Sequence, residues 1–242
     1  MAAEQGETNT RPGPLALVGS GEYLEVMASV EGALIDGRPP RYVQLATAAA
    51  PEGADRLAYW HDLGRAQARR LGVEPVIIPV NNRVDADNPE FAGAVRGAGL
   101  IYLSGGDPGY LADTLRDTAV WRAIVEEWRG GAALAGCSAG AMAMTSWIPS
   151  LRHPKRGHTP GLGLLPHLRV IPHFDYFHRA IPHVLDHFLA PRDGEILIGI
   201  DEETAIVGGP TEWHVAGRQA AWVITPHGRT DFRENSVIRT AL

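Results

Sequence analysis

Residues 130–145 read GGAALAGCSAGAMAMT, and this stretch decides the fold. Its first part, Ala132 to Ala135, is small and apolar, which is typical of a short strand buried on both faces. Its second part, Ala139 to Met144, is rich in alanine and methionine, which favour a helix. Between them lies a G-x-S-x-G motif with Ser138 at its centre. The stretch therefore predicts a strand that turns sharply into a helix.

The motif also indicates a chemical role for Ser138. A residue at such a turn is strained, its side chain projects above the sheet, and side chains on the flanking residues would collide with the neighbouring backbone. Free N–H groups at the start of a helix favour developing negative charge. Ser138 is therefore a candidate nucleophile, and the alternative is a tightly packed junction with a structural role alone. Cys137, the only cysteine of the chain, is expected to be a small buried thiol.

The bulk composition is that of a globular protein. The 242 residues are 45% hydrophobic and 21% charged, and they can form one large α/β domain or two small ones. A formal net charge of -6 without any Lys/Arg-rich run argues against a nucleic-acid partner. No apolar run reaches the roughly 20 residues of a membrane helix, and the first residues lack the apolar core of a signal peptide. With one cysteine, these features predict a cytoplasmic protein without a membrane partner, and they are compatible with a homodimer.

Predicted strands and helices alternate ahead of the motif. Strands are predicted over residues 15–18, 41–47, 73–80 and 100–103, and helices over residues 54–71, 88–95, 109–116 and 120–128. Pro75 and Pro79 place the third of these strands nearer a sheet edge. The alternation predicts a three-layer α/β fold, a mostly parallel sheet with right-handed crossovers and flanking helices.

The pattern changes after Thr145. Residues 146–166 are rich in Pro, Gly, His and Arg, which predicts a long loop over the crevice. The later predictions are a strand over residues 168–173, a helix over 177–189, an Ile-rich segment over 195–207, and a β-hairpin over 213–225 that turns at Gly217 and Arg218. The expected organisation is a flexible leader over residues 1–14 and a single α/β hydrolase-type domain over residues 15–242 with a C-terminal β-hairpin.

A serine nucleophile needs a base, and the base needs a carboxylate to hold it. His173 ends a predicted strand and is therefore expected at the same sheet edge as Ser138. Asp201, Glu202 and Glu203 follow another predicted strand, and adjacent side chains on an extended chain point opposite ways, so Glu202 opposes its two neighbours. Which of the three faces the histidine stays open. The alternatives are a satisfied, partly buried histidine and a solvated acidic turn.

Backbone N–H groups aimed at the developing charge would complete such a site. The N–H of Ala139, directly after the candidate nucleophile, is one donor. The paired glycines Gly105 and Gly106 follow a predicted strand, where parallel sheets place their binding crevices, and either would supply the second donor. The expected oxyanion hole is Gly106 with Ala139, and Gly105 and Asp107 are expected to bind the substrate.

Neither a metal ion nor an organic cofactor is predicted. His183 and His187 lie four residues apart with Asp186 beside them, but there is no H-E-x-x-H motif and no cysteine partner. The loop Gly19-Ser20-Gly21-Glu22 after the first strand lacks the third glycine of a dinucleotide-binding fingerprint. It reads as a tight loop.

Four short motifs occur in a characteristic order: Gly105-Gly106-Asp107, residues 135–141 around Ser138, His173-Phe174, and residues 199–205. In this order the chain resembles the dipeptidase E and cyanophycinase family of serine peptidases, over residues 15–207. The resemblance implies a class I glutamine-amidotransferase-like fold, which is a flavodoxin-like arrangement. It also implies a triad of Ser138, His173 and Glu202, and an oxyanion hole from the paired glycines and Ala139.

Two departures from the family pattern bear on the substrate. Members similar to cyanophycinase carry a polar residue after the Gly-Gly-Asp motif and an arginine-rich run after His-Phe, where this chain has Pro108 and the single Arg179. Members similar to dipeptidase E usually carry Asn at the position of Asp107. The expected function is a serine peptidase that cleaves small peptides or isopeptide-like amides through an acyl-enzyme on Ser138. The alternatives are a glutamine-amidotransferase-like hydrolase of another amide or ester, and a non-catalytic small-molecule-binding relative.

Overall fold

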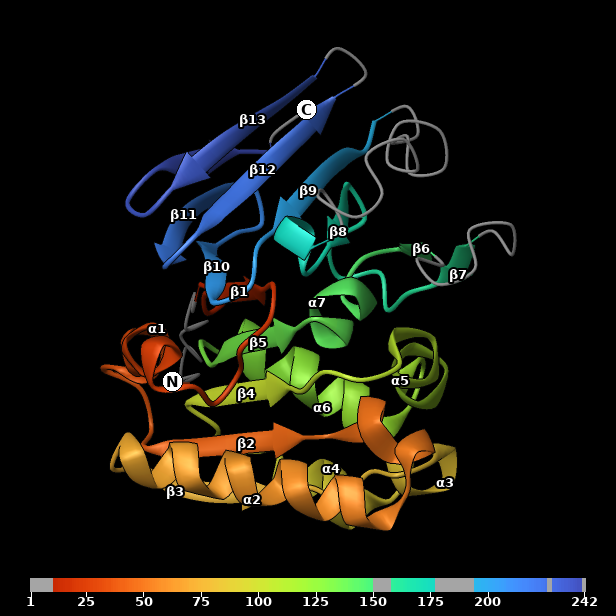
Figure 1. Cartoon of the computed structure of the whole chain (residues 1–242). Coiled ribbons are helices and arrows are strands. Elements are labelled where there is room, and N and C mark those ends of the chain that lie inside the picture. The colour runs from red at the N-terminus through yellow and green to blue at the C-terminus, as the bar shows by residue number, and fades with distance from the viewer. Residues whose placement is uncertain (1–10, 150–157, 177–193, 226–227, 241–242) are drawn as a thin grey trace, which may run out of the picture.

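The computed structural model describes residues 11–149, 158–176, 194–225 and 228–240 (Figure 1). Its helices are α1 (Glu25–Ile35), α2 (Ala54–Arg70), α3 (Arg83–Ala86), α4 (Pro89–Ala94), α5 (Pro108–Leu115), α6 (Ala119–Arg129) and α7 (Ala139–Ala143), with a 3₁₀ helix at Thr47–Glu52. Its strands are β1 (Leu15–Val18), β2 (Arg41–Leu45), β3 (Glu74–Ile77), β4 (Leu100–Leu103), β5 (Ala133–Cys137), β6 (Trp147–Pro149), β7 (His158–Pro160), β8 (Leu168–Ile171), β9 (Ile196–Ile200), β10 (Thr204–Gly208), β11 (Glu212–Gly217), β12 (Ala220–Thr225), β13 (Gly228–Arg233) and β14 (Val237–Arg239). Every element predicted up to Thr145 is present, and α1, α3 and the 3₁₀ helix are additions.

The larger sheet has the strand order β14-β11-β10-β1-β5-β4-β2-β3. From β1 to β3 in this order all neighbours are parallel, whereas β10, β11 and β14 extend the sheet in antiparallel fashion. Strand β3 lies at the edge, as its two prolines indicated. Strand β5 lies between β1 and β4, so the G-x-S-x-G motif follows a central strand.

Helices cover both faces of the parallel strands. In β4, Ile101 and Leu103 belong to a hydrophobic cluster that includes residues of α5, α6 and α7. The intervening Leu100 and Tyr102 belong to a second cluster, which includes residues of α1 and α2. Because side chains alternate along a strand, each central strand supplies both clusters. This is the three-layer α/β fold predicted from the sequence.

A smaller sheet, with the order β13-β12-β9-β8, lies beside the larger one and above it in Figure 1. Strands β8 and β9 are parallel, and the other two pairings are antiparallel. Helix α7 contacts both β5 and β8 and so lies between the sheets. Ile198 and Ile200 of β9 belong to the same hydrophobic cluster as Leu134 of β5, so one core spans both sheets.

The hairpin predicted over residues 213–225 is wrong in its pairing. Strand β11 pairs with β10 and β14 in the larger sheet, whereas β12 pairs with β9 and β13 in the smaller one. At Gly217 the chain passes from one sheet to the other, with a φ of 108° and a close approach to Glu203. Period-two alternation identifies strands but does not identify their partners. The C-terminal hairpin is formed one strand later, by β12 and β13.

One further prediction changes. Residues 146–166 contain the antiparallel pair β6 and β7 and are not one continuous loop. Of the leader predicted over residues 1–14, residues 1–10 lie outside the described residues. The N–H of Gly13 donates to the carbonyl oxygen of Trp128, and the indole N–H of Trp128 donates to the carbonyl oxygen of Gly13, both at 2.8 Å. The helix predicted over residues 177–189 lies outside the described residues. Within the described ranges, no helix has the length and apolar character needed to cross a membrane.

Candidate active site

Ser138 occupies a sharp turn between β5 and α7. Its φ of 48° and ψ of -104° lie in a region that side chains rarely adopt, and this strained geometry is typical of functional sites. The two glycines of the motif make the turn sterically feasible. A Cβ atom on Gly136 would lie 2.5 Å from the carbonyl carbon of Gly140, and one on Gly140 would lie 2.3 Å from the carbonyl oxygen of Leu103. The predicted elbow is therefore present, and backbone contacts fix it.

The Ser138 side chain begins a chain of two hydrogen bonds. Its Oγ lies 3.0 Å from Nε2 of His173, and Nδ1 of the same ring lies 2.8 Å from Oε1 of Glu202. In the tautomer with its proton on Nδ1, the ring donates to the carboxylate and accepts from the hydroxyl. The His173 side chain is 32% exposed and that of Glu202 is 47% exposed, so the arrangement opens to solvent. Such a chain can carry a proton away from the hydroxyl.

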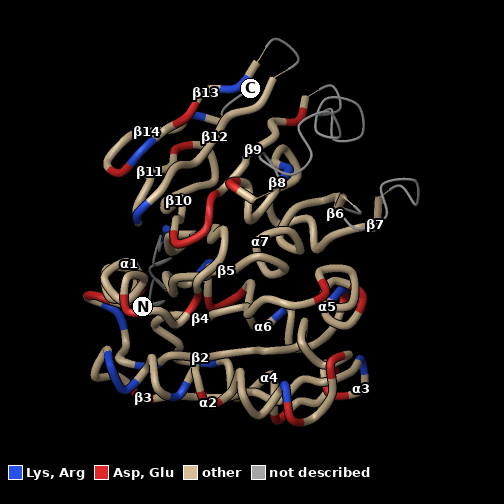
Figure 2. Tube along the Cα trace, in the orientation of Figure 1, with Lys and Arg blue, Asp and Glu red and all other residues tan. Residues whose placement is uncertain are grey.

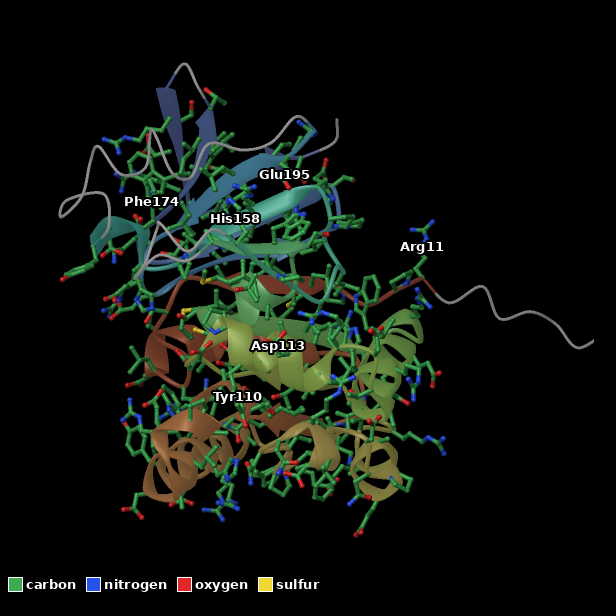
Figure 3. All side chains as sticks on the ribbon, turned by 90° about the vertical axis from the view of Figure 1, so that its right-hand side faces the viewer. Arg11, Tyr110, Asp113, His158, Phe174 and Glu195 are labelled. Atoms are coloured by element: carbon green, nitrogen blue, oxygen red, sulfur yellow. The ribbon has the colours of Figure 1, made fainter. Side chains whose placement is uncertain are left out.

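The turn after β8 brings His173 to Ser138. His173 has a φ of 50°, and the next residue, Phe174, is fully buried. Figure 3 labels Phe174 in the upper part of the molecule, among the strands of the smaller sheet. Its ring packs 5.6 Å from that of Trp222 and against Gly199, where a Cβ atom would lie 2.5 Å from the ring. The buried phenylalanine therefore anchors the turn that presents the histidine.

The acidic turn between β9 and β10 offers three carboxylates, visible as a red run in Figure 2. Asp201 is buried and accepts hydrogen bonds from the backbone of Ala220 and the indole of Trp222. Glu203 pairs with Arg218 at 3.0 Å. These contacts leave Glu202 as the carboxylate that faces the imidazole, an assignment that the residue pattern alone left open.

Glu202 is held from the backbone side as well. Its N–H donates to Oδ1 of Asp175 at 3.1 Å, and its carbonyl oxygen accepts from Nε2 of Gln219 at 3.1 Å. Gln219 also donates to Oδ2 of Asp175 at 3.4 Å. Residues from the His173 turn, the acidic turn and the crossing between the two sheets therefore meet around one backbone segment.

The backbone near Ser138 supplies two N–H groups. Ala139 is the first residue of α7, where an N–H has no intrahelical acceptor. Gly106 is exposed, and within the described part of the chain its N–H has no hydrogen-bond acceptor. A Cβ atom on Gly106 would lie 2.3 Å from the carbonyl oxygen of Ala48, so only glycine fits there. The two candidate donor amides thus come from the loop after β4 and from the start of α7.

Gly105 and Asp107, which are predicted to bind the substrate, each have a hydrogen-bond partner within the chain. The N–H of Gly105 donates to Oε1 of Glu22 at 2.9 Å, so this amide is not available as the alternative oxyanion donor or to a substrate oxygen. Asp107 is exposed, but its Oδ1 accepts from the N–H of Tyr110 at 2.9 Å and caps α5. A Gly-Gly-Asp motif shows where a strand ends, but it does not show which of its polar groups the protein itself uses.

A known protein family matches most of this chain. The family described as peptidase family S51 matches residues 19–214. The chain belongs to peptidase family S51. A cyanophycinase of Trichormus variabilis is 30% identical over 179 residues, which are 69% of this chain and 59% of the relative. A cyanophycinase of Synechococcus elongatus is 30% identical over 186 residues, covering 73% of this chain and 55% of the relative. The S51 chain thus spans a little over half the length of these curated relatives.

Solved structures resemble the S51 chain along most of its length. A peptidase from an acI-B1 Actinobacterium is 43% identical, with a TM-score of 0.87 over 96% of this chain and 98% of that one. A putative peptidase E from Listeria monocytogenes is 18% identical, with a TM-score of 0.64 over 86% of this chain and 100% of that one, and this likeness concerns the fold alone. The expected class I glutamine-amidotransferase-like fold is the fold of this family.

The single cysteine of the S51 chain is not a competing nucleophile. Cys137 is fully buried, as expected, and its thiol donates to Oε2 of Glu22 at 2.8 Å. Burial, and then the neighbouring Glu22, raise the pKa of the Cys137 thiol well above its usual range. The reactive thiolate is therefore disfavoured.

Glu22 is the residue at this site that the sequence analysis missed. It lies in the loop after β1, is 9% exposed, and accepts from both the Gly105 amide and the Cys137 thiol. An acidic residue directly after a glycine-rich turn at the end of a buried strand was the available signal. Among the described residues no group of three or more His, Cys, Asp or Glu side chains could hold a metal ion, and His183 and His187 lie outside those residues.

Proposed function

We propose that this S51 chain is a serine peptidase in which Ser138 is the nucleophile, His173 the general base and acid, and Glu202 the residue that orients the base. The observation that carries the proposal is the unbroken chain of hydrogen bonds from Ser138 Oγ through the His173 ring to Glu202 Oε1. Membership of a peptidase family supports the class of reaction.

In the acylation half, Ser138 Oγ attacks the carbonyl carbon of the substrate amide while its proton passes to Nε2 of His173. The carbonyl π electrons move onto oxygen and form a tetrahedral oxyanion. As that intermediate collapses, the imidazolium returns its proton to the leaving nitrogen. An amine departs, and an ester links the acyl group to Ser138.

In the deacylation half, water attacks the ester carbon while Nε2 of His173 takes a proton from it. The second tetrahedral intermediate expels Ser138 Oγ, which regains its proton from the imidazolium, and the acid product leaves. Glu202 accepts from Nδ1–H at 2.8 Å throughout, so it fixes the tautomer and stabilises each imidazolium.

The N–H groups of Gly106 and Ala139 are the proposed oxyanion donors. They come from the loop after β4 and from the elbow, and Gly105 between them lies beside the nucleophile, since a Cβ atom there would lie 3.6 Å from Cβ of Ser138. Preorganised donors of this kind account for about 10² to 10³ in rate each.

The proposed substrates are small peptides or isopeptide-like amides. The cyanophycinases and the peptidase among the similar proteins support cleavage of an amide bond. Asp107 and Glu202 are exposed, and Tyr176, 67% exposed, follows the His173 turn. Asp107 keeps one carboxylate oxygen beyond its capping bond, and its contact with the substrate stays a prediction.

The decisive experiment combines Ser138→Ala with a matched serine control. Ser138→Ala is expected to abolish turnover and labelling by a serine-directed phosphonate, with unchanged unfolding temperature. Ser29→Ala removes an exposed hydroxyl that donates to the carbonyl oxygen of Val26, one turn away in α1, and it is expected to keep both. Peptide mapping of the labelled wild type should place the adduct on Ser138. Full turnover by Ser138→Ala would reject the proposed nucleophile.

A panel of substrates distinguishes peptidase activity from the alternative, hydrolysis of another amide or of an ester. Dipeptides, isopeptides, simple esters and glutamine are compared by kcat/KM on the wild type and Ser138→Ala. Ser138-dependent cleavage of peptides or isopeptides supports the proposal. Preferential cleavage of esters or glutamine would instead identify a hydrolase of another amide or ester.

A further inference from the structure

The loop Gly19-Ser20-Gly21-Glu22 contacts the acidic turn, the loop after β4 and the end of β5. The N–H of Gly19 donates to the carbonyl oxygen of Thr204 at 2.9 Å, and the carbonyl oxygen of Ser20 accepts from the N–H of Glu203 at 3.1 Å. These two bonds hold the loop against the acidic turn. Through Glu22, the same loop reaches the amide of Gly105 and the thiol of Cys137.

We infer that Glu22 is a positioning residue that sets the distance and orientation between the two halves of the oxyanion hole. This inference rests on the proposed function and deepens it. Glu22 joins the loop that carries Gly106 to Cys137, the last residue of β5, which directly precedes Ser138 and Ala139; one carboxylate oxygen bonds to each side.

The bond to Gly105 decides which amide faces the substrate. Consecutive amides in this loop have different partners: that of Gly105 donates to Glu22, and that of Asp107 donates to the carbonyl oxygen of Ala48 at 2.8 Å. The amide of Gly106 lies between these two fixed points and remains exposed. Without the carboxylate, the buried Gly105 amide loses its acceptor, and the loop can rotate to satisfy it.

The fit around this carboxylate is tight. A Cβ atom on Gly105 would lie 2.8 Å from Oε1 of Glu22, so glycine is required for the close approach. The neighbouring residues reinforce the contact, because the hydroxyl of Tyr23 lies 2.6 Å from Oγ of Ser104. Glu22 and Tyr23 are therefore hydrogen-bonded to Gly105 and Ser104, the two residues that precede Gly106.

Glu31 provides a matched control. It is a second buried glutamate on the same side of the sheet, 1% exposed, and it accepts from the hydroxyl of Tyr42 at 2.7 Å. Neither Gly105 nor Cys137 is among its hydrogen-bond partners in the described residues. A substitution at Glu31 therefore perturbs a buried carboxylate without removing the hydrogen bond to Gly105 in the loop after β4.

The test compares Glu22→Asp, which keeps the charge but shortens the side chain, with Glu22→Gln, which keeps the length and one acceptor oxygen. Glu22→Asp is expected to lower kcat about 10²-fold, with KM changed less than about 3-fold, because a displaced donor weakens transition-state binding. Glu22→Gln is expected to stay within about 10-fold of wild type, because its amide oxygen can accept from Gly105.

Inhibition by a peptide aldehyde gives a second readout that loss of general stability would not move. The aldehyde forms a tetrahedral oxyanion on Ser138, so Glu22→Asp should weaken its inhibition by the same factor as kcat, whereas Glu31→Asp should leave it unchanged. Equal effects of Glu22→Asp and Glu31→Asp, or wild-type kcat in Glu22→Asp, would overturn the inference alone. Absence of Ser138-dependent turnover in the wild type would overturn the proposed function and this inference with it.

Discussion

The two sides of the site are built by different means. On the nucleophile side, Ser138 follows a fully buried central strand, and backbone atoms lie so close that Gly136 and Gly140 cannot carry a side chain. On the base side, the His173 and Glu202 side chains are 32% and 47% exposed and rest on turns of the smaller sheet. The first side is fixed by backbone packing and the second by one anchored ring and a few side-chain hydrogen bonds. A nucleophile fixed by close packing can thus be combined with a base and acid that adapt to the substrate.

The largest expected effect tests the division between the base and its acid partner. His173→Ala should lower kcat about 10⁶-fold, because it removes the imidazole that accepts the serine proton. Glu202→Gln should lower it about 10³- to 10⁴-fold, since the half-exposed carboxylate orients the ring and does not itself take the proton. Steady-state kinetics measure both, and the double variant should be no slower than His173→Ala alone. Additive losses would contradict a proton path shared by the two residues.

The second effect concerns the rigidity of the nucleophile side. Gly140→Ala places a Cβ atom 2.3 Å from a backbone oxygen, so it should lower the free energy of unfolding by about 3 kcal/mol or more. Gly93→Ala, on an exposed helical glycine with nothing within 4 Å, should raise it by up to about 1 kcal/mol. Urea titrations compare the two. Similar free energies of unfolding for both variants would show that the elbow can relax.

The third effect is a pH dependence of stability that arises at Glu31, a buried residue of helix α1. Burial raises the pKa of Glu31 from 4.5 to about 7. The folded state therefore binds this proton more tightly than the unfolded state, and the stability that results is present below pH 4.5 and lost as the pH rises through 7. Replacement by Gln removes this dependence. The free energy of unfolding of Glu31→Gln, taken relative to that of wild type, should therefore be about 2 to 3 kcal/mol larger at pH 8 than at pH 5.

Chemical denaturation of the wild type and Glu31→Gln at both pH values measures that gain. Parallel stability curves would mean that the carboxyl of Glu31 titrates near its ordinary value in the folded protein.

The smallest expected effect concerns the exposed ion pair of the base side. Arg218 and Glu203 lie 3.0 Å apart, with side chains 67% and 30% exposed. Arg218→Ala should lower the free energy of unfolding by less than about 1 kcal/mol, because water and salt screen such pairs. It should change kcat by no more than a few-fold, since Glu203 does not contact the histidine. A loss approaching that of Glu202→Gln would show that Glu203 takes part in orienting the base.

The same division explains what the sequence could predict. Strand–helix alternation and the G-x-S-x-G motif predicted the parallel half, because local periodicity and glycine requirements are written in consecutive residues. Helix α1 carries Met27, Val30 and Leu34 at helical spacing, so its signal was present and unused. His173 and the acidic residues 201–203 could be predicted to lie at one edge of the sheet, because each comes at the end of a predicted strand.

The partners of the C-terminal strands could not be obtained in this way. Strands β11 and β12 alternate alike, yet tertiary contacts assign them to different sheets. The choice among the three acidic residues depended in the same way on distant groups, the indole of Trp222 for Asp201 and Arg218 for Glu203. Glu22 stayed hidden because its two partners lie 83 and 115 positions along the chain.

The buried thiol beneath the elbow has a practical consequence. Because the chain contains one cysteine, every reaction with a thiol reagent reports on Cys137. That sulfur is fully buried at the end of β5, directly before the nucleophile, so a reagent reaches it only during transient opening of this segment. The rate at which a thiol reagent modifies Cys137 thus reports how often this segment opens. That rate should fall when an inhibitor occupies Ser138.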